Sequence, residues 1–143
     1  MHKISLTVKS ESFTAKERRA IEITAKRAIK YLLLGRFVKK INILPLAWSP
    51  GHPDDMTGLT VSPSKKVPHW TIYVEPQQDL AEMRSTTMHE VLHVALSVLR
   101  KHPNTITVPK MKRAKTGYLT FQLDDLEERI CRLIEEPEEV LEG

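Results

Sequence analysis

The stretch that decides how this chain is interpreted is TTMHEVLHVAL, Thr86 to Leu96. It places His89 and His93 four residues apart, with Glu90 directly after the first histidine. Residues four apart on an α-helix lie about 40° apart around its axis, one turn above each other. Both imidazoles can therefore reach a single ion, while Glu90, offset by about 100°, can reach a water molecule beside that ion. The pattern predicts a metal site with its own acid–base group.

The residues around this motif favour the metal interpretation. They are almost all apolar, so a helix expected over about 80–101 is mostly buried. Burying two imidazoles and a carboxylate without partners costs on the order of several kcal/mol, and a bound dication removes that cost. The alternative is that the histidines form hydrogen bonds with core carbonyl groups and that Glu90 pairs with an arginine.

A third protein ligand has to come from outside this helix. One extended form of the motif supplies a glycine and a third histidine at the positions that Leu96 and Leu99 occupy here. That class of site is therefore excluded. The remaining solution is a carboxylate from the last predicted helix, expected over about 123–135.

Among the carboxylates of that last helix, Glu127 is the favoured ligand. With the apolar residues turned towards the core, Glu127 falls within about 60° of the centre of the apolar face, whereas Glu128 lies near its back. A carboxylate beside a buried stripe is costly unless it is neutralised. Glu128 is therefore the second choice, and Asp124 and Asp125 are less favoured. The alternative for Glu127 is a boundary position from which its carboxylate reaches water.

Two segments resemble a known family. TTMHEVLHVAL is similar to the long consensus of the zincins, which has uncharged residues before, within and after the histidines. LEERICRLI, residues 126–134, resembles the Glu-bearing helix of the small zincin-like metallopeptidases that are common in phage genomes. The likeness covers about residues 72–134. It implies a minimal zincin in which His89 and His93 bind Zn²⁺, Glu90 is the general base, and a downstream glutamate is the third zinc ligand.

The rest of the chain fits one α+β domain over residues 1–143. We expect a small mixed or antiparallel sheet packed on an N-terminal helix and on the helix that carries the His89–Glu90–x–x–His93 motif (HExxH). The C-terminal helix with the third metal ligand follows. The acidic tail from about 136 is expected to fray. The expected strands are 3–8, 41–48, 57–63 and 69–76, the first helix is 14–35, and residues 104–117 are expected to form a loop.

Charge and composition narrow the cellular context. The net charge is +4, but residues 1–123 hold 20 of the 22 basic and nine of the 18 acidic residues, a surplus of +11. Such a body could attract nucleic acid or an acidic partner, although a solvated surface is the favoured explanation. The single Cys131 excludes an intramolecular disulfide and a CxxC metal site. Without a signal-peptide core or an apolar run of membrane-spanning length, we expect a cytoplasmic protein with no membrane partner.

The predicted activity is zinc-dependent hydrolysis of peptide bonds. Glu90 would take a proton from the attacking water and deliver it to the leaving amine. We expect Tyr118 and Tyr73 to contact the substrate, with Tyr118 as a donor to the developing oxyanion. The peptide would add to an edge strand formed by residues 69–76.

Two other classes of function stay open from the sequence. The first is a zinc-dependent hydrolase or binding protein that acts on nucleic acid, which the basic body suggests. The second is a non-catalytic protein with a structural metal, which leaves the position of Glu90 unexplained. Neither the substrate nor the oligomeric state follows from the sequence.

Overall fold

Helices and strands follow one another in the order β-α-β-β-β-α-α-α in a computed structural model of the chain. The structure describes residues 4–9, 12–49, 51, 56–76, 79–101 and 114–142, and from residue 114 onwards it describes the side chains of 122–140. The elements are β1 (Ser5–Val8), α1 (Ala15–Leu32), β2 (Lys40–Pro45), β3 (Gly58–Val61), β4 (Trp70–Val74), α2 (Leu80–Arg100), α4 (Ala114–Glu135) and α5 (Pro137–Glu142), with short 3-10 helices at Leu34–Arg36 and Leu46–Trp48.

The strands form one four-stranded mixed sheet in the order β1-β2-β4-β3. β1, β2 and β4 are parallel, and β3 pairs antiparallel with β4. The predicted α+β class is therefore confirmed, with the mixed sheet as the arrangement observed. The prediction that residues 69–76 form an edge strand is wrong, because β4 lies between β2 and β3. Four of the five β4 side chains are buried, which suits a central strand, and β3 takes the edge.

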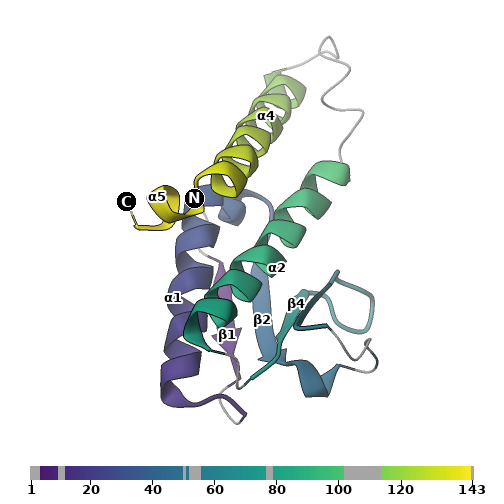
Figure 1. The fold of residues 1–143 in the computed structure, drawn as a ribbon. Coiled ribbons are helices and arrows are strands. Elements are labelled where there is room, and N and C mark those ends of the chain that lie inside the picture. The colour runs from purple at the N-terminus through teal and green to yellow at the C-terminus, as the bar shows by residue number, and fades with distance from the viewer. Residues whose placement is uncertain are drawn as a thin grey trace.

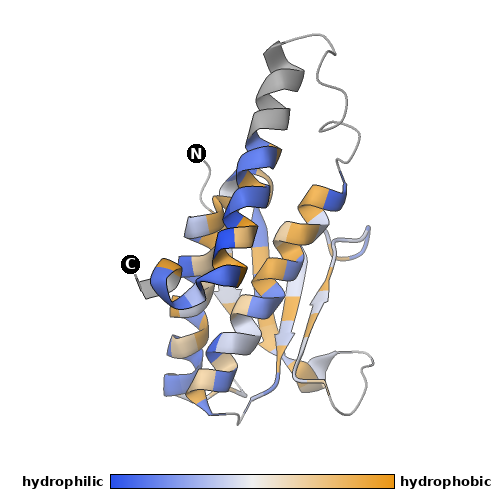
Figure 2. Ribbon diagram, turned by 45° about the horizontal axis from the view of Figure 1, so that its top comes forward, coloured by the Kyte–Doolittle hydropathy of each residue, from blue (hydrophilic) through white to orange (hydrophobic). Residues whose placement is uncertain are grey.

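Helices α1 and α2 lie side by side over one face of the sheet (Figure 1). The core fills the space between these helices and the strands, and Figure 2 shows hydrophobic residues concentrated in the strands and along α2. Burying one large aliphatic side chain contributes about 1.5–3 kcal/mol. The side chains with no exposed surface include Ile21, Leu32, Ile41, Ile43, Ile72, Val91, Leu123, Leu126 and Leu133.

Both α1 and α2 begin where the sequence predicts, each directly after a capping residue. At the start of α1, the Glu17 amide donates to Thr14 Oγ1 at 3.1 Å and the Thr14 amide donates to Glu17 Oε1 at 2.9 Å, so the capping box is complete. At the start of α2, the Glu82 amide donates to Asp79 Oδ1 at 2.9 Å. α1 ends at Leu32, before the predicted end at residue 35, and its C-cap residue Leu33 has φ 53° and ψ 41°.

The C-terminal region differs from the prediction in three respects. α4 begins at Ala114, inside the segment expected as a loop. Ile134, one of the apolar residues of the last predicted helix that were expected to turn towards the core, is 57% exposed. The tail forms α5 instead of fraying, and Val140 packs against the core. Pro137 at the first helical position and the acidic residues of the first turn favour a helix start there.

No helix in the described ranges has the length and apolar character that crossing a bilayer requires.

Candidate metal centre

The two histidines of the motif meet on the exposed face of α2. His89 Nε2 and His93 Nε2 are 3.0 Å apart, and the ring planes are inclined at 83°. Two ligands of a tetrahedral zinc ion, each about 2.0–2.1 Å from it, lie about 3.3 Å from each other. The observed separation is therefore close to the one that a shared zinc ion needs.

Among the residues that the structure describes, neither histidine has the main-chain carbonyl partner that the non-metal interpretation requires. Within the described ranges, each ring has the other ring as its hydrogen-bond partner, and neither is bonded to a main-chain carbonyl. The Glu90 carboxylate completes a compact group: one ligand atom from each of His89, Glu90 and His93 lies within 4.8 Å of the other two. Imidazole nitrogens and carboxylate oxygens are both common ligands of zinc, so these residues fit a zinc ion.

Glu90 is held in the protein interior by the edge strand. Its side chain is only 5% exposed, and Thr60 on β3 donates its hydroxyl hydrogen to Glu90 Oε1 at 2.7 Å. The same hydroxyl oxygen lies 3.1 Å from the main-chain oxygen of Glu90. No arginine or lysine of the described ranges forms an ion pair with Glu90. The predicted alternative of an arginine partner is therefore not observed in this part of the chain, and a neutral hydroxyl orients the carboxylate.

Gly58 allows β3 to approach α2 closely. A Cβ atom at this position would lie 2.7 Å from Thr86 Cγ2 and 2.8 Å from Glu90 Oε2. Such distances are too short for non-bonded atoms, so any side chain here would displace the strand, Thr86 or the Glu90 carboxylate. The absence of a side chain at residue 58 thus contributes directly to the position of Glu90.

The three motif residues line a cleft of about 550 Å³ between β3 and α2. On the α2 side the wall continues to Ser97, and on the other side it follows residues 56–60 and Ser62. Trp70 also lines it. Glu90 is the one acidic residue among the described lining residues, and none of them is a lysine or arginine. An edge strand, a fixed carboxylate and two imidazoles therefore face the same cleft.

The predicted third ligands lie elsewhere. Glu127 and Glu128 are exposed on α4 and line a second hollow together with Asp124, Asp125 and Cys131. This hollow shares no residue with the cleft at His89, and neither glutamate belongs to the His–Glu–His group. The structure thus does not bring either glutamate to the histidines, and the third ligand stays a prediction.

Asp125, one of the less favoured candidates, already has partners. Its Oδ2 atom lies 3.2 Å from Arg36 Nη1 and accepts a hydrogen bond from Arg129 Nε at 2.9 Å. Arg129 also donates to the Tyr31 carbonyl oxygen at 2.7 Å. These contacts hold α4 against the C-terminal end of α1, so the Asp125 carboxylate stabilises the packing of the two helices.

Of the two predicted substrate-binding tyrosines, the structure describes the side chain of Tyr73, and it does not place this side chain in the cleft. Tyr73 is half-buried on β4, where strand alternation places it on the sheet face opposite Ile72 and Val74, and it is not among the lining residues. Tyr118 belongs to α4, but its side chain lies outside the described residues.

Sequence reasoning missed Thr60 and Gly58, although their segment carries a signal. In TGLTV the apolar Leu59 and Val61 alternate with the small Gly58 and Thr60. A strand that turns its apolar residues away from the helices is unusual, and here the small residues face α2. Two small residues on one face of a short strand therefore indicate close approach to another element.

The resemblance of TTMHEVLHVAL and LEERICRLI to segments of small zincins stays a prediction from the sequence. Comparison of the chain with protein-family models, curated proteins and solved structures finds no match.

Proposed function

We propose that this protein is a zinc-dependent metallopeptidase. In this proposal His89 and His93 hold the zinc ion and Glu90 is the general base. The observation that carries it is the pairing of two imidazole nitrogens 3.0 Å apart with a buried carboxylate in the same cleft. A structural metal needs ligands alone, whereas a carboxylate oriented by Thr60 beside the two histidines suits proton transfer.

The residues of the chain have separate tasks in this reaction. A bound zinc ion would supply Lewis acidity towards the substrate carbonyl and acidify a water ligand. His89 and His93 offer their Nε2 atoms as neutral donors. Glu90 accepts a proton from the water that attacks the carbonyl carbon and returns it to the leaving amine nitrogen. Thr60 holds the Glu90 carboxylate in one orientation, which lowers the cost of reaching the reactive geometry.

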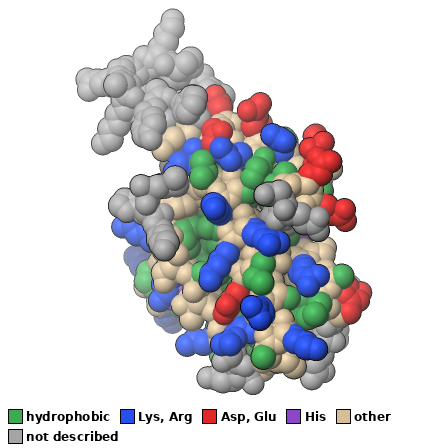
Figure 3. Space-filling view, turned by 90° about the vertical axis from the view of Figure 1, so that its left-hand side faces the viewer, with side chains coloured by type: hydrophobic (Ala, Val, Ile, Leu, Met, Phe, Trp, Pro, Cys, Tyr) green, Lys and Arg blue, Asp and Glu red, His purple; other side chains and the backbone are tan. Residues whose placement is uncertain are grey.

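The cleft suits an extended peptide better than a nucleic acid. Among the described strands, β3 pairs only with β4, so its outer edge can hydrogen-bond to an added peptide strand. Phosphate backbones require lysine and arginine contacts, and no such residue is among the described lining of the cleft. Figure 3 shows basic side chains spread over the side of the molecule on which α1 lies, and the exposed ones on α1 include Lys16, Arg19, Lys26, Arg27 and Lys30.

The zinc content of the wild-type protein tests the proposal directly. Protein purified without a tag or added metal is expected to contain about one equivalent of zinc per chain, because a single two-histidine site is proposed. A peptide library followed by mass spectrometry should show cleavage that a chelator abolishes and added zinc restores. Elemental analysis that finds no zinc, together with no rise in Tm on zinc addition, would contradict the metal site.

Replacing Thr60 by valine tests how Glu90 is oriented. Hydrogen bonds to charged groups contribute about 1.5–3 kcal/mol, so kcat/KM is expected to fall about 10- to 100-fold in Thr60→Val. Thr60→Ser keeps the hydroxyl group and should retain most of the activity. Steady-state kinetics, with zinc content measured on each variant, provide the comparison. Equal activity of the serine and valine variants would show that this hydrogen bond does not contribute.

A further inference from the structure

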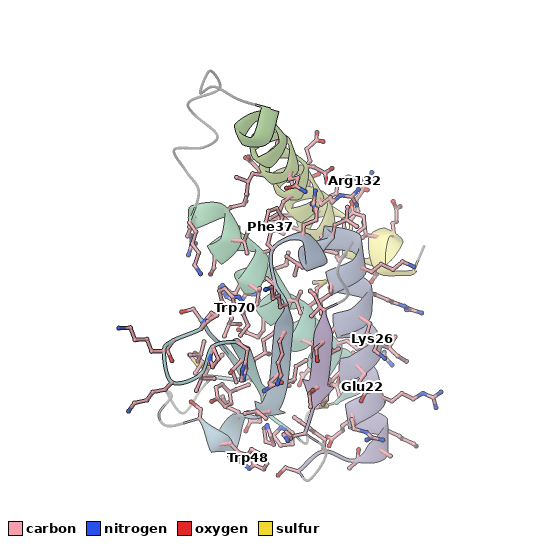
Figure 4. The ribbon with its side chains drawn as sticks, turned by 180° about the vertical axis from the view of Figure 1, so that it is seen from behind. Glu22, Lys26, Phe37, Trp48, Trp70 and Arg132 are labelled. Carbon is pink, nitrogen blue, oxygen red and sulfur yellow. The ribbon has the colours of Figure 1, made fainter. Side chains whose placement is uncertain are left out.

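A lysine lies beside Trp70, one of the residues that line the cleft. Lys101 follows the last residue of α2, and its Nζ atom lies 5.5 Å from the centre of the Trp70 ring. This is within the distance of about 6 Å at which an ammonium group is attracted to an aromatic face. Trp70 is itself 5% exposed and lines the cleft; Figure 4 labels it on β4. The buried ring therefore gives the Lys101 charge a defined place.

The contacts of β3 give the cleft a direction. Gly58 lies against Thr86 at one end, and Thr60 contacts Glu90 in the middle. The strand pairing of Val61 with Thr71 continues towards Ser62 and Trp70, which both line the cleft. On the helix side, the lining residue Ser97 lies one turn before Lys101. The Lys101 end is therefore the end at which β3 finishes.

The distance from the reaction centre to Lys101 corresponds to a few peptide residues. Lys101 lies eight positions after His93, which corresponds to a rise of about 12 Å along a helix. An extended peptide covers that length in about three to four residues. Since both the lysine and a substrate side chain extend towards each other, a contact is expected about two to four residues from the cleaved bond.

The positive charge at this end is not neutralised within the described part of the chain. No carboxylate there lies within ion-pair distance of Lys101. Arg100 is exposed beside it, and the connection after Ser62 carries the exposed Lys65 and Lys66. An uncompensated ammonium group beside a substrate cleft attracts negative charge and raises its local concentration.

We propose that the Lys101 end of the cleft selects substrates that carry a carboxylate there. This inference rests on the proposed peptidase function and names the substrate class. The carboxylate is either an aspartate or glutamate side chain or the C-terminal carboxylate of the peptide. A peptide antiparallel to β3 directs its N-terminal part to the Lys101 end, whereas a parallel one directs its C-terminus there. The position of the preferred carboxylate thus also reports the direction of binding.

Matched peptides test this selection. Each peptide carries glutamate, glutamine or lysine at one of four positions on either side of the cleaved bond, with a free or an amidated C-terminus. Wild-type zinc-loaded protein is assayed for kcat/KM. Zinc-loaded Glu90→Gln protein is assayed for peptide affinity by fluorescence anisotropy. At the position facing Lys101 we expect glutamate to be preferred over glutamine about fivefold, the factor that a well-placed exposed ion pair gives.

Two variants with the same charge change locate the effect. Lys101→Glu is expected to reverse the preference in favour of lysine-containing peptides. Lys26→Glu, at an exposed position on α1 away from the cleft lining, alters net charge equally and leaves the Trp70 contact intact, so it should keep the wild-type preference. A preference confined to free C-termini identifies the terminal carboxylate as the group that is bound.

The outcomes separate this inference from the peptidase proposal. Equal cleavage of the glutamate, glutamine and lysine peptides overturns the selection while the peptidase function stands. A glutamate preference that survives in Lys101→Glu also overturns it. If no peptide is cleaved, the peptidase proposal fails, and the affinities of Glu90→Gln still decide the selection: the predicted pattern supports it, and uniform or undetectable binding overturns it.

Discussion

Replacing Glu90 by glutamine is expected to lower kcat/KM for peptide hydrolysis by about 10³-fold, within the range that general acid–base catalysis contributes. The amide has the shape of the carboxylate and can still accept a hydrogen bond from Thr60, so the fold and the histidine positions should be preserved. It cannot take up the proton of the attacking water. Steady-state kinetics on zinc-loaded protein, with zinc measured by elemental analysis, give both readouts on one sample.

The control for this variant lies on the same helix. Glu82 is exposed in the first turn of α2, so Glu82→Gln makes the same chemical change away from the cleft and should leave activity and zinc content unchanged. Glu90→Gln protein as active as the wild type would remove Glu90 from the role of base. A loss of zinc together with activity would instead assign Glu90 as a zinc ligand. This outcome has to be tested, because a carboxylate oxygen of Glu90 lies within 4.8 Å of the histidine nitrogens.

Removing one histidine is expected to reduce zinc affinity by about 10³-fold. Loss of a group that merely orients a ligand already costs about 10- to 100-fold, and loss of a ligand costs more. His89→Ala and His93→Ala should show similar losses, because the two Nε2 atoms hold equivalent positions 3.0 Å apart. Competition with a chromophoric chelator measures the affinity.

His69→Ala is the matched control for these variants. His69 is the other histidine in the described ranges, and its Nε2 atom lies 2.9 Å from Asn42 Nδ2, outside the cleft group. Its removal should leave zinc affinity unchanged. If His69→Ala loses as much zinc as His93→Ala, zinc binding does not report on the proposed site.

The same assay identifies the third ligand. The helical wheel of the sequence predicts that Glu127→Ala weakens zinc binding more than Glu128→Ala, whereas the exposed positions of both glutamates predict wild-type affinity in both variants. The reverse order would exchange the two assignments. Wild-type affinity in both variants would exclude both glutamates, which agrees with their place in a separate hollow on α4.

The sequence by itself determined the helices and the histidine pair. The capping residues Thr14 and Asp79 fixed the starts of α1 and α2, and the spacing of His89 and His93 fixed their common face. These features depend on hydrogen bonds and side-chain contacts between residues three or four apart, which the order of residues specifies directly. The apolar surroundings of the motif also correctly indicated a buried Glu90, but the expectation that both imidazoles are buried is wrong, because His89 and His93 lie on the exposed face of α2.

Only the tertiary structure decided what surrounds that pair. Thr60 reaches Glu90 across 30 residues of sequence, β3 takes the sheet edge expected for residues 69–76, and the Lys101 ammonium group lies beside the Trp70 ring. The helical wheel placed Glu127 near the apolar stripe, yet the packing of α4 leaves it exposed. Strand order and helix docking are chosen by competition among many apolar surfaces of similar energy. The periodicity of one segment shows which of its faces is buried, but it does not show which other element that face packs against.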